Sequence, residues 1–190
     1  MKKPKVLLVS LSHRKQGNTR DALEILRREM DSRADTELLE LADYDVRHCL
    51  ACDACRTGGC GVKDDFPVLI RKVEEADALI LGSPVYVGSI TSLGSAFIQR
   101  LTYYLKNQGR TLEGKIGSPV IVAGECGHLS AYHQILDFFM VNGMYAAGSD
   151  YWPVLTASRK NTVKDSGGSA ENLRVLGRRI LDFTGGWKSE

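Results

Sequence analysis

Short apolar runs alternate with amphipathic stretches over most of the chain. The apolar runs are short enough for buried strands, whereas the stretches between them carry apolar residues at helical spacing. The pattern predicts five strands, at 5–11, 36–41, 77–84, 118–124 and, with a weaker signal, 145–151. It predicts five helices, at 19–30, 64–76, 92–105, 130–143 and 168–186.

This order of elements predicts an α/β fold. Regular alternation of strands and helices is typical of a parallel sheet with helices on both faces. Two segments interrupt it: the cysteine-rich segment 49–60, where the second crossover belongs, and the polar segment 150–168, which is longer than an ordinary connection. We expect residues 1–190 to form a single domain with a cysteine loop and a C-terminal extension. We interpret 150–168 as an active-site or subunit-contact element.

Composition narrows the functional classes. The 190 residues are 43% hydrophobic, enough for one core, and 25 Lys and Arg nearly balance 23 Asp and Glu. That balance argues against a nucleic-acid partner. No apolar run reaches the roughly 18 residues of a membrane span. The start MKKPKVLLVSLSHRK predicts a first strand, because its apolar part is too short for a signal peptide and charges follow at once. We therefore expect a cytoplasmic protein without a membrane partner.

Four of the five cysteines lie in the segment CLACDACRTGGC, and they are Cys49, Cys52, Cys55 and Cys60. In a reducing compartment such clustering indicates metal or redox chemistry. Two-residue gaps let successive sulfurs point inward, and Gly58 and Gly59 let the chain double back, as a 4Fe-4S cluster requires. Arg56 either offsets the charge of such a cluster or faces water. The alternatives are a zinc site, free thiols or an air-formed disulfide, although four-cysteine zinc sites usually use two well-separated C-x-x-C pairs.

The loop after the first predicted strand, SLSHRKQGNT, has the composition of a phosphate cradle. It lies at the carboxyl end of a strand and just before a helix, where backbone N–H groups and the helix dipole attract anions. It matches neither G-x-G-x-x-G nor the Walker sequence, so a monophosphate such as that of FMN fits better than a pyrophosphate. In the alternative interpretation, its polar side chains only cap the helix. The candidate cofactor-binding residues here are Ser12, Arg14, Gln16, Gly17, Asn18 and Thr19.

Two further loops, GSPVYVGS at 82–89 and AGECGHLS at 123–130, follow the third and fourth predicted strands. Their glycines let the backbone approach a flat ligand closely, so three loops at one end of a sheet can surround one planar cofactor and its phosphate. The alternatives are an ordinary turn with a surface tyrosine, an inert cysteine, and a His128 without a chemical task. The candidate cofactor-binding residues are Pro84, Val85, Tyr86, Val87, Gly88, Ser89, Gly124, Glu125, Cys126 and Gly127.

Several of these segments together resemble a known family. SHRKQGNT, GSPVYVGSITS followed by AFIQR, and the loop 123–127 resemble the flavodoxin-like, NAD(P)H-dependent FMN reductase superfamily, from about Lys5 to about Tyr151. With its cysteine segment the chain resembles an iron–sulfur flavoprotein, which carries FMN and a 4Fe-4S cluster. The resemblance implies a doubly wound sheet of five parallel strands in order 2-1-3-4-5, with the cysteine loop after strand two. The chain departs from the family in having Ser95 and Gln99 where Lys and Asp are common, and Gly-Glu-Cys-Gly where a Gly-Gly pair is common.

The resemblance also implies roles for the candidate residues. Ser12, Arg14, Asn18 and Thr19 should hold the FMN phosphate, Pro84 to Ser89 should contact the ring and ribityl chain, and Gly124 to Gly127 should border the ring. We expect electron transfer with ferredoxin or NAD(P)H as redox partner, and no catalytic acid or base. A homodimer or homotetramer is implied, with Trp152 and Trp187 available for subunit contact. The alternatives are an NAD(P)H-dependent FMN, quinone or nitro-compound reductase without a cluster, and a zinc-stabilised binding module without enzymatic activity.

Overall fold

A parallel sheet lies at the centre of the molecule. The computed structural model, which describes residues 2–157, 163 and 167–186, has the strand order β2-β1-β3-β4-β5, with β6 beside the end of β4. Every pairing is parallel, so the predicted flavodoxin-like order 2-1-3-4-5 is confirmed. The strands are β1 (Lys5–Ser10), β2 (Asp35–Glu40), β3 (Ala78–Pro84), β4 (Ile116–Ala123), β5 (Tyr145–Ala146) and β6 (Val154–Thr156).

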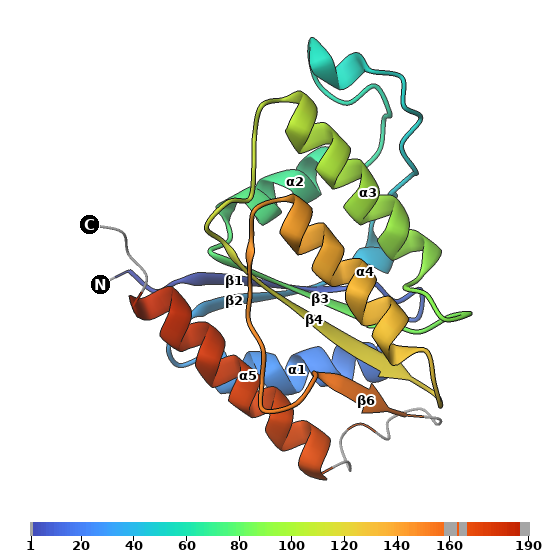
Figure 1. Ribbon diagram of the computed structural model, residues 1–190. Helices are drawn as coiled ribbons and strands as arrows, with labels where there is room; N and C mark the ends of the chain where they lie inside the picture. Colours follow the sequence, from blue (N-terminus) through green and yellow to red (C-terminus); the bar gives the residue numbers. More distant parts are fainter. Residues whose placement is uncertain (1, 158–162, 164–166, 187–190) are drawn as a thin grey trace.

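Helices cover both faces of this sheet. Figure 1 shows α1 and α5 on one face and α2, α3 and α4 on the other. All five predicted helices are present, and their ends differ from the prediction by no more than two residues. They are α1 (Asn18–Met30), α2 (Phe66–Glu75), α3 (Ser92–Asn107), α4 (His128–Val141) and α5 (Gly167–Gly186), with short 3-10 helices η1 (Leu41–Asp43) and η2 (Ala54–Arg56). No helix in the described part of the chain is long and apolar enough to cross a membrane.

Burial follows from the position of each element. The interior strand β4 is buried at every residue, whereas the edge strand β2 begins with alternating exposure, as expected for a strand with only one neighbour. Apolar side chains of α1 and α5 pack on one face of the sheet, and those of α2, α3 and α4 pack on the other. The two layers fix the strand ends, and therefore the loops after them.

The fifth strand differs from the prediction. Residues 145–151 were expected to form one strand, but only Tyr145 and Ala146 pair with β4 before the chain leaves the sheet. The chain returns as Val154–Thr156, inside the segment 150–168 that was expected to be irregular. Residues 158–162 and 164–166 of that segment lie outside the described residues, as does Trp187.

Pro119 in β4 accounts for the break. Gly117 O accepts a hydrogen bond from Ala147 N at 2.8 Å, and Ile121 N donates to Pro153 O at 2.9 Å. Alternate residues of β4 therefore direct their backbone polar groups toward the strand position beside it that β5 and β6 occupy. Pro119, halfway between Gly117 and Ile121, is one of these residues. Proline has no N–H to give to a neighbouring strand, so the pairing is interrupted beside it. Because the missing N–H of Pro119 is on the side away from β3, the pairing of β4 with β3 is continuous.

Candidate functional site

The loops after β1 and β3 contact one another at the carboxyl edge of the sheet. Leu11 N donates to Gly82 O at 2.7 Å, and the Thr91 hydroxyl donates to Leu11 O at 2.5 Å. The rings of His13 and Tyr86 stack, with centroids 6.3 Å apart and planes inclined by 19°. The first-strand loop and the 82–89 loop are thereby held as one surface, as the sequence predicts.

A glycine stands at the N-cap position of α1. Gly17, and not Ser12, Asn18 or Thr19, occupies that position. The Ser12 hydroxyl instead accepts a hydrogen bond from Arg14 N at 3.0 Å. Ser12 and Thr19 are buried, whereas the Arg14 side chain is exposed. A helix start of this kind favours an anion at its N–H groups.

Glu40, the last residue of β2, supports the first-strand loop, and the sequence did not predict this contact. The buried Glu40 accepts hydrogen bonds through Oε1 from Gln16 N at 3.3 Å and from Arg20 Nη1 at 2.8 Å. Gln16 has φ of 55°, in the left-handed region, so its backbone is held in a less favourable conformation. Lys15 forms an ion pair with Asp43. The signal available in the sequence was an acidic residue at the end of the strand that neighbours β1, Glu40, and another shortly after it, Asp43.

A tight exposed turn lies at the tip of the 82–89 loop. Tyr86 N donates to Ser89 O at 2.9 Å, and Ser89 N donates to Tyr86 O at 3.1 Å. Between them Val87 and Gly88 have φ of 52° and 70°, the signs that a type I′ turn requires. Gly88 adopts this conformation easily, but a β-branched residue does not. Val87 is fully exposed, so no packing in the described chain compensates for this strain.

The loop after β4 lies against that turn. A Cβ atom placed on Gly127, which has φ of 83°, would lie 3.0 Å from Val85 Cγ1 and 3.1 Å from Gly88 Cα. This close approach requires glycine. Gly124, Glu125 and Cys126 are exposed, and a Cβ on Gly124 would meet nothing within 4 Å. Residues 124–126 therefore line open space at the same edge, where a flat ring has room to lie.

His128 does not face this space as a free group. Its Nε2 lies 3.2 Å from Leu155 O of β6, and the residue opens α4. Gln134 of α4 accepts hydrogen bonds from the Ser89 hydroxyl at 3.0 Å and from Ile90 N at 3.1 Å. Both side chains therefore anchor the loops to α4 and β6.

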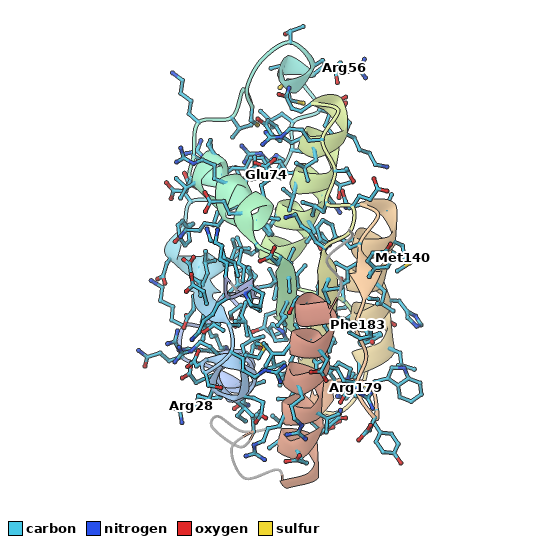
Figure 2. The ribbon with its side chains drawn as sticks, turned by 90° about the vertical axis from the view of Figure 1, so that its left-hand side faces the viewer. Arg28, Arg56, Glu74, Met140, Arg179 and Phe183 are labelled. Carbon is cyan, nitrogen blue, oxygen red and sulfur yellow. The ribbon has the colours of Figure 1, made fainter. Side chains whose placement is uncertain are left out.

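The cysteine loop is closed at its neck, ahead of α2. Asp45 N donates to the Asp65 carboxylate at 2.8 Å, and Asp65 N donates to Asp45 O at 3.0 Å. Arg47 N donates to the Asp64 carboxylate at 2.9 Å. Figure 1 shows the loop beyond this neck projecting away from the sheet, beside the C-terminal end of α3. Figure 2 places Arg56 at the outer tip of the loop.

All four cysteines of the loop are free thiols, with Cys55 buried, Cys52 exposed, and Cys49 and Cys60 between these limits. Their number and kind are the donor set of an iron–sulfur cluster. Ala51 N lies 3.4 Å from Cys49 Sγ, and Ala51 and Asp53 have positive φ values of 49° and 58°. Strained turns of this kind between cysteines fit a ligand-binding loop.

The four sulfurs are not gathered at one point. Within the described ranges, no group of three or more His, Cys, Asp or Glu side chains could hold a metal ion. The assignment of Cys49, Cys52, Cys55 and Cys60 as cluster ligands therefore stays a prediction. The donor set fits a cluster in number and chemistry.

One face of α3 holds the cysteine loop. Asn107 Nδ2 lies 3.4 Å from Cys55 Sγ, and the Tyr103 hydroxyl donates to the Asp53 carboxylate at 2.5 Å. Gln108 donates to Gly58 O at 2.9 Å. Side chains three or four residues apart on a helix share a face, so α3 supplies a row of polar contacts along the loop.

Arg100 is the most buried member of this row, with only 1% of its side chain exposed. Its nitrogens donate to Arg47 O at 3.0 Å, to Val62 O at 3.3 Å and to both Asp64 carboxylate oxygens, at 2.5 and 3.0 Å. Nη2 also lies 3.1 Å from Cys60 Sγ. Its Nε is buried and has no hydrogen-bond partner among the described residues.

The pair formed by Arg100 and Asp64 is ionised. Burial by itself would raise the pKa of Asp64, but hydrogen bonds from Arg100 and from backbone N–H groups outweigh it and lower that pKa below its ordinary value. The sequence leaves open whether Arg56 offsets the charge of a cluster or faces water. In the structure Arg56 is exposed and pairs with Asp53 at 3.2 Å. The available signal was an arginine at an otherwise apolar, inward position of the predicted helix 92–105.

α3 separates the two candidate sites. At its N-terminus the Ser92 hydroxyl lies 3.3 Å from His13 Nε2, beside the first-strand loop, whereas Asn107 at its end contacts Cys55. At about 1.5 Å per residue, these ends are about 20 Å apart. The cysteine loop of one chain therefore does not lie at the carboxyl edge of its own sheet.

A groove of about 1020 Å³ opens at the opposite, amino-terminal edge of the sheet. It is lined by Lys3, Lys5, Glu75, Asp77 and the end of α5, among others. Helix C-termini carry negative partial charge, and the C-terminal residues of α2 and α5 lie here. The groove carries basic side chains, including Lys2, Arg33 and Lys115, beside its acidic ones. We place the cofactor candidate at the carboxyl edge because the three glycine-containing loops lie there.

Comparison with known proteins agrees with this arrangement. The model of the NADPH-dependent FMN reductase family matches residues 4–158. An iron–sulfur flavoprotein of Methanocaldococcus jannaschii is 30% identical over 190 residues, covering 94% of this chain and 96% of the relative. An NADH:FMN oxidoreductase structure, in its apo form, has a TM-score of 0.69 at 20% identity, covering 99% of this chain and 92% of its own. A flavodoxin from the domain Archaea has a TM-score of 0.64 at 20% identity, covering 95% of this chain and 99% of its own.

The structural likenesses, at 20% identity, confirm the flavodoxin-like fold alone. The sequence likenesses go further, because a family model matches most of the chain and a relative is 30% identical over nearly its whole length. The chain therefore belongs to the NADPH-dependent FMN reductase family and, within it, to the iron–sulfur flavoproteins.

Proposed function

We propose that this protein binds FMN and a 4Fe-4S cluster and transfers electrons between a reduced carrier and an acceptor. The observation that carries the proposal is the combination of two built features in one chain. Three glycine-containing loops lie at the carboxyl edge of the sheet, and four free thiols lie in a loop whose neck is fixed by the buried pair of Arg100 and Asp64. The family to which the chain belongs supports both assignments.

At the carboxyl edge, the phosphate of FMN would lie near the start of α1, where the helix dipole favours an anion and Arg14 supplies an exposed guanidinium. The turn at Val87 and Gly88 would lie along the ring, and Gly124 leaves open space beside it. When bound, FMN accepts electrons in pairs or singly, and an iron–sulfur cluster accepts them singly. The residues of the chain hold and orient these groups, so no acid or base side chain is required.

The distance between the two sites supports an oligomer. Because the length of α3 separates them within one chain, direct transfer is favoured if the cysteine loop of one subunit approaches the flavin of another. We therefore propose a homodimer or homotetramer. Sedimentation at high protein concentration tests this, and a monomer would contradict it.

The redox partner and the cellular location are also proposals. Ferredoxin and NAD(P)H are the partner classes to test, and an oxidant such as oxygen or peroxide is a candidate acceptor. Cys49, Cys52, Cys55 and Cys60 lie close together in the sequence as free thiols, which fits a reducing compartment. This supports a cytoplasmic location.

Anaerobic purification followed by absorption spectroscopy and analysis of flavin, iron, zinc and acid-labile sulfide tests the central proposal. FMN together with about four iron and four sulfide per chain supports it. A yellow protein with FMN but without iron would point to the second candidate, a reductase without a cluster, which the exposed Cys52 and the separated sulfurs favour. A colourless protein with zinc would overturn both. Adding ferredoxin or NAD(P)H without air then identifies the donor that reduces the flavin.

A further inference from the structure

We infer that Arg100 is a positioning residue for the cysteine loop, and that Arg100 and Asn107 of α3 act as hydrogen-bond donors to the cluster-binding sulfurs of Cys60 and Cys55. The donor role toward the cluster rests on the proposed function. The positioning role of Arg100 concerns the thiols themselves and is testable without a metal.

The contacts of Arg100 leave its guanidinium no freedom. Both Nη atoms donate hydrogen bonds to the Asp64 carboxylate, at 2.5 and 3.0 Å. A lysine cannot reproduce this two-pronged geometry. The guanidinium also lies over the Phe66 ring, with Cζ 4.0 Å from the ring centroid. Its direction is therefore fixed before any ligand binds.

The fixed guanidinium holds both arms of the loop. It donates to Arg47 O on the arm that leads to Cys49, and to Val62 O on the arm that leaves Cys60. The remaining contact, Nη2 to Cys60 Sγ at 3.1 Å, is directed at the sulfur itself. A residue that only joined the two arms would not need this last contact.

Asn107 extends the same arrangement by two helical turns. Its Nδ2 lies 3.4 Å from Cys55 Sγ, and Cys55 is the one buried thiol among the four. Two of the four sulfurs thus meet N–H donors from one rigid helix. Hydrogen bonds to ligand sulfurs and nearby positive charge stabilise the reduced, more negative state of a cluster and raise its reduction potential.

The test compares Arg100→Gln and Arg100→Lys with Arg56→Gln, which removes an exposed arginine from the same loop without touching a sulfur. In the metal-free protein, alkylation by iodoacetamide is mapped by mass spectrometry. We expect Cys60 to react several-fold faster in Arg100→Lys, relative to Cys52 of the same sample, because lysine keeps a positive charge beside the thiol but loses the two-pronged contact that holds the loop. The rate should be unchanged in Arg56→Gln, and a smaller increase is expected in Arg100→Gln, which also removes the charge that favours the thiolate. An unchanged or slower Cys60 rate in soluble Arg100→Lys protein would overturn the positioning role.

The cluster readouts use the FMN-containing protein after anaerobic reconstitution, with flavin content as the control for folding. We expect iron loss to a chelator to be about tenfold faster or more in Arg100→Gln, because side chains that hydrogen-bond to ligands commonly contribute about 10- to 100-fold to metal affinity. We expect a more negative cluster midpoint potential in Arg100→Gln and a smaller shift in the same direction in Asn107→Leu. Midpoints equal to that of Arg56→Gln in both variants would overturn the donor role.

Failure of the proposed function gives a different result. A wild-type protein that takes up no iron and sulfide on reconstitution would remove the cluster and, with it, the donor role. The alkylation rates of Cys60 would still decide whether Arg100 positions that thiol. If Arg100→Gln does not accumulate as folded protein, Arg100→Lys and Asn107→Leu carry the same comparisons.

Discussion

Arg100 of α3 and Asp64, just before α2, form an ion pair with a nitrogen–oxygen distance of 2.5 Å, and their side chains are 1% and 0% exposed. The pair joins elements separated by 36 residues in sequence. It also lies between the cysteine loop and the main body of the fold. Its loss should therefore affect the stability of the whole domain as well as the order of the loop.

We expect Asp64→Asn to lower the free energy of unfolding by about 3–5 kcal/mol, because it leaves a buried guanidinium without its counter-charge. Urea unfolding of the cofactor-free protein measures the loss. The matched control is Asp182→Asn, which breaks an exposed pair with Arg33 at 3.3 Å and should cost about 1 kcal/mol or less. Equal losses in the two variants would contradict the structural importance of the buried pair.

Arg14→Ala should weaken FMN binding about tenfold or more, since a hydrogen bond to a charged group contributes about 1.5–3 kcal/mol. Riboflavin, which lacks the phosphate, should bind to the variant as it does to the wild type. Fluorescence titration of both flavins with the flavin-free protein measures the difference. Lys15→Ala is the control, because Lys15 forms an ion pair with Asp43. A loss of affinity that is the same for FMN and riboflavin would argue against a phosphate contact of Arg14.

Gly124→Val tests the ring-side assignment. A Cβ at Gly124 or at Gly148 would meet nothing within 4 Å, so neither Gly124→Val nor Gly148→Val should disturb the packing. Only Gly124 lies at the carboxyl-edge loops, so we expect Gly124→Val to lose FMN affinity while Gly148→Val retains it. Thermal melting of the flavin-free variants checks the fold. Full FMN affinity in Gly124→Val would move the ring away from this loop.

The parts of the fold that the sequence predicts are those that depend on local pattern. Strand and helix alternation fixes the order of the elements, and the three carboxyl-edge loops follow from it because parallel strands end at the same edge. The break in the fifth strand depends on Pro119, a residue of the neighbouring strand, and is visible only once the pairing of β4 with Ala147 and Pro153 is known.

The supports of the two sites were missed for a similar reason. Glu40 contacts Gln16 across 24 residues and Arg100 contacts Cys60 across 40 residues, and neither spacing has a local signature. A charged residue in the apolar face of a predicted helix is a usable signal of a buried contact with a neighbouring loop. The positions of the four sulfurs are likewise a property of the folded loop, which residue spacing alone does not determine.

Val87 is a site where stability can be gained. Its φ of 52° is unfavourable for a β-branched residue, whereas asparagine is preferred at this position of a type I′ turn. We expect Val87→Asn to raise the free energy of unfolding by about 1 kcal/mol, measured by urea unfolding. Val68→Asn, on the exposed face of α2, is the control and should give no gain. A less stable Val87→Asn protein would mean that the valine side chain makes contacts that offset the strain.

Glu24 of α1 makes part of the stability dependent on pH. Hydrogen bonds from Arg27, and further ones from Arg28, lower the pKa of Glu24 from 4.5 to about 2 despite its partial burial. Because the pKa is lower in the folded state, the contribution of Glu24 is complete above about pH 5 and is lost as the pH falls from about 4.5 to about 2.

We therefore expect Glu24→Gln to be less stable than the wild type by about 1 kcal/mol near neutral pH, a value reduced for solvent screening of a partly exposed pair. The difference should shrink as the pH falls below about 4.5 and vanish near pH 2. Urea unfolding of the two cofactor-free proteins across this range measures it. Glu171→Gln is the control, because Glu171 pairs with Arg174 and Arg178 in a more exposed position. A difference that stays constant between neutral pH and about pH 2 would show that Glu24 acts through packing and not through its charge.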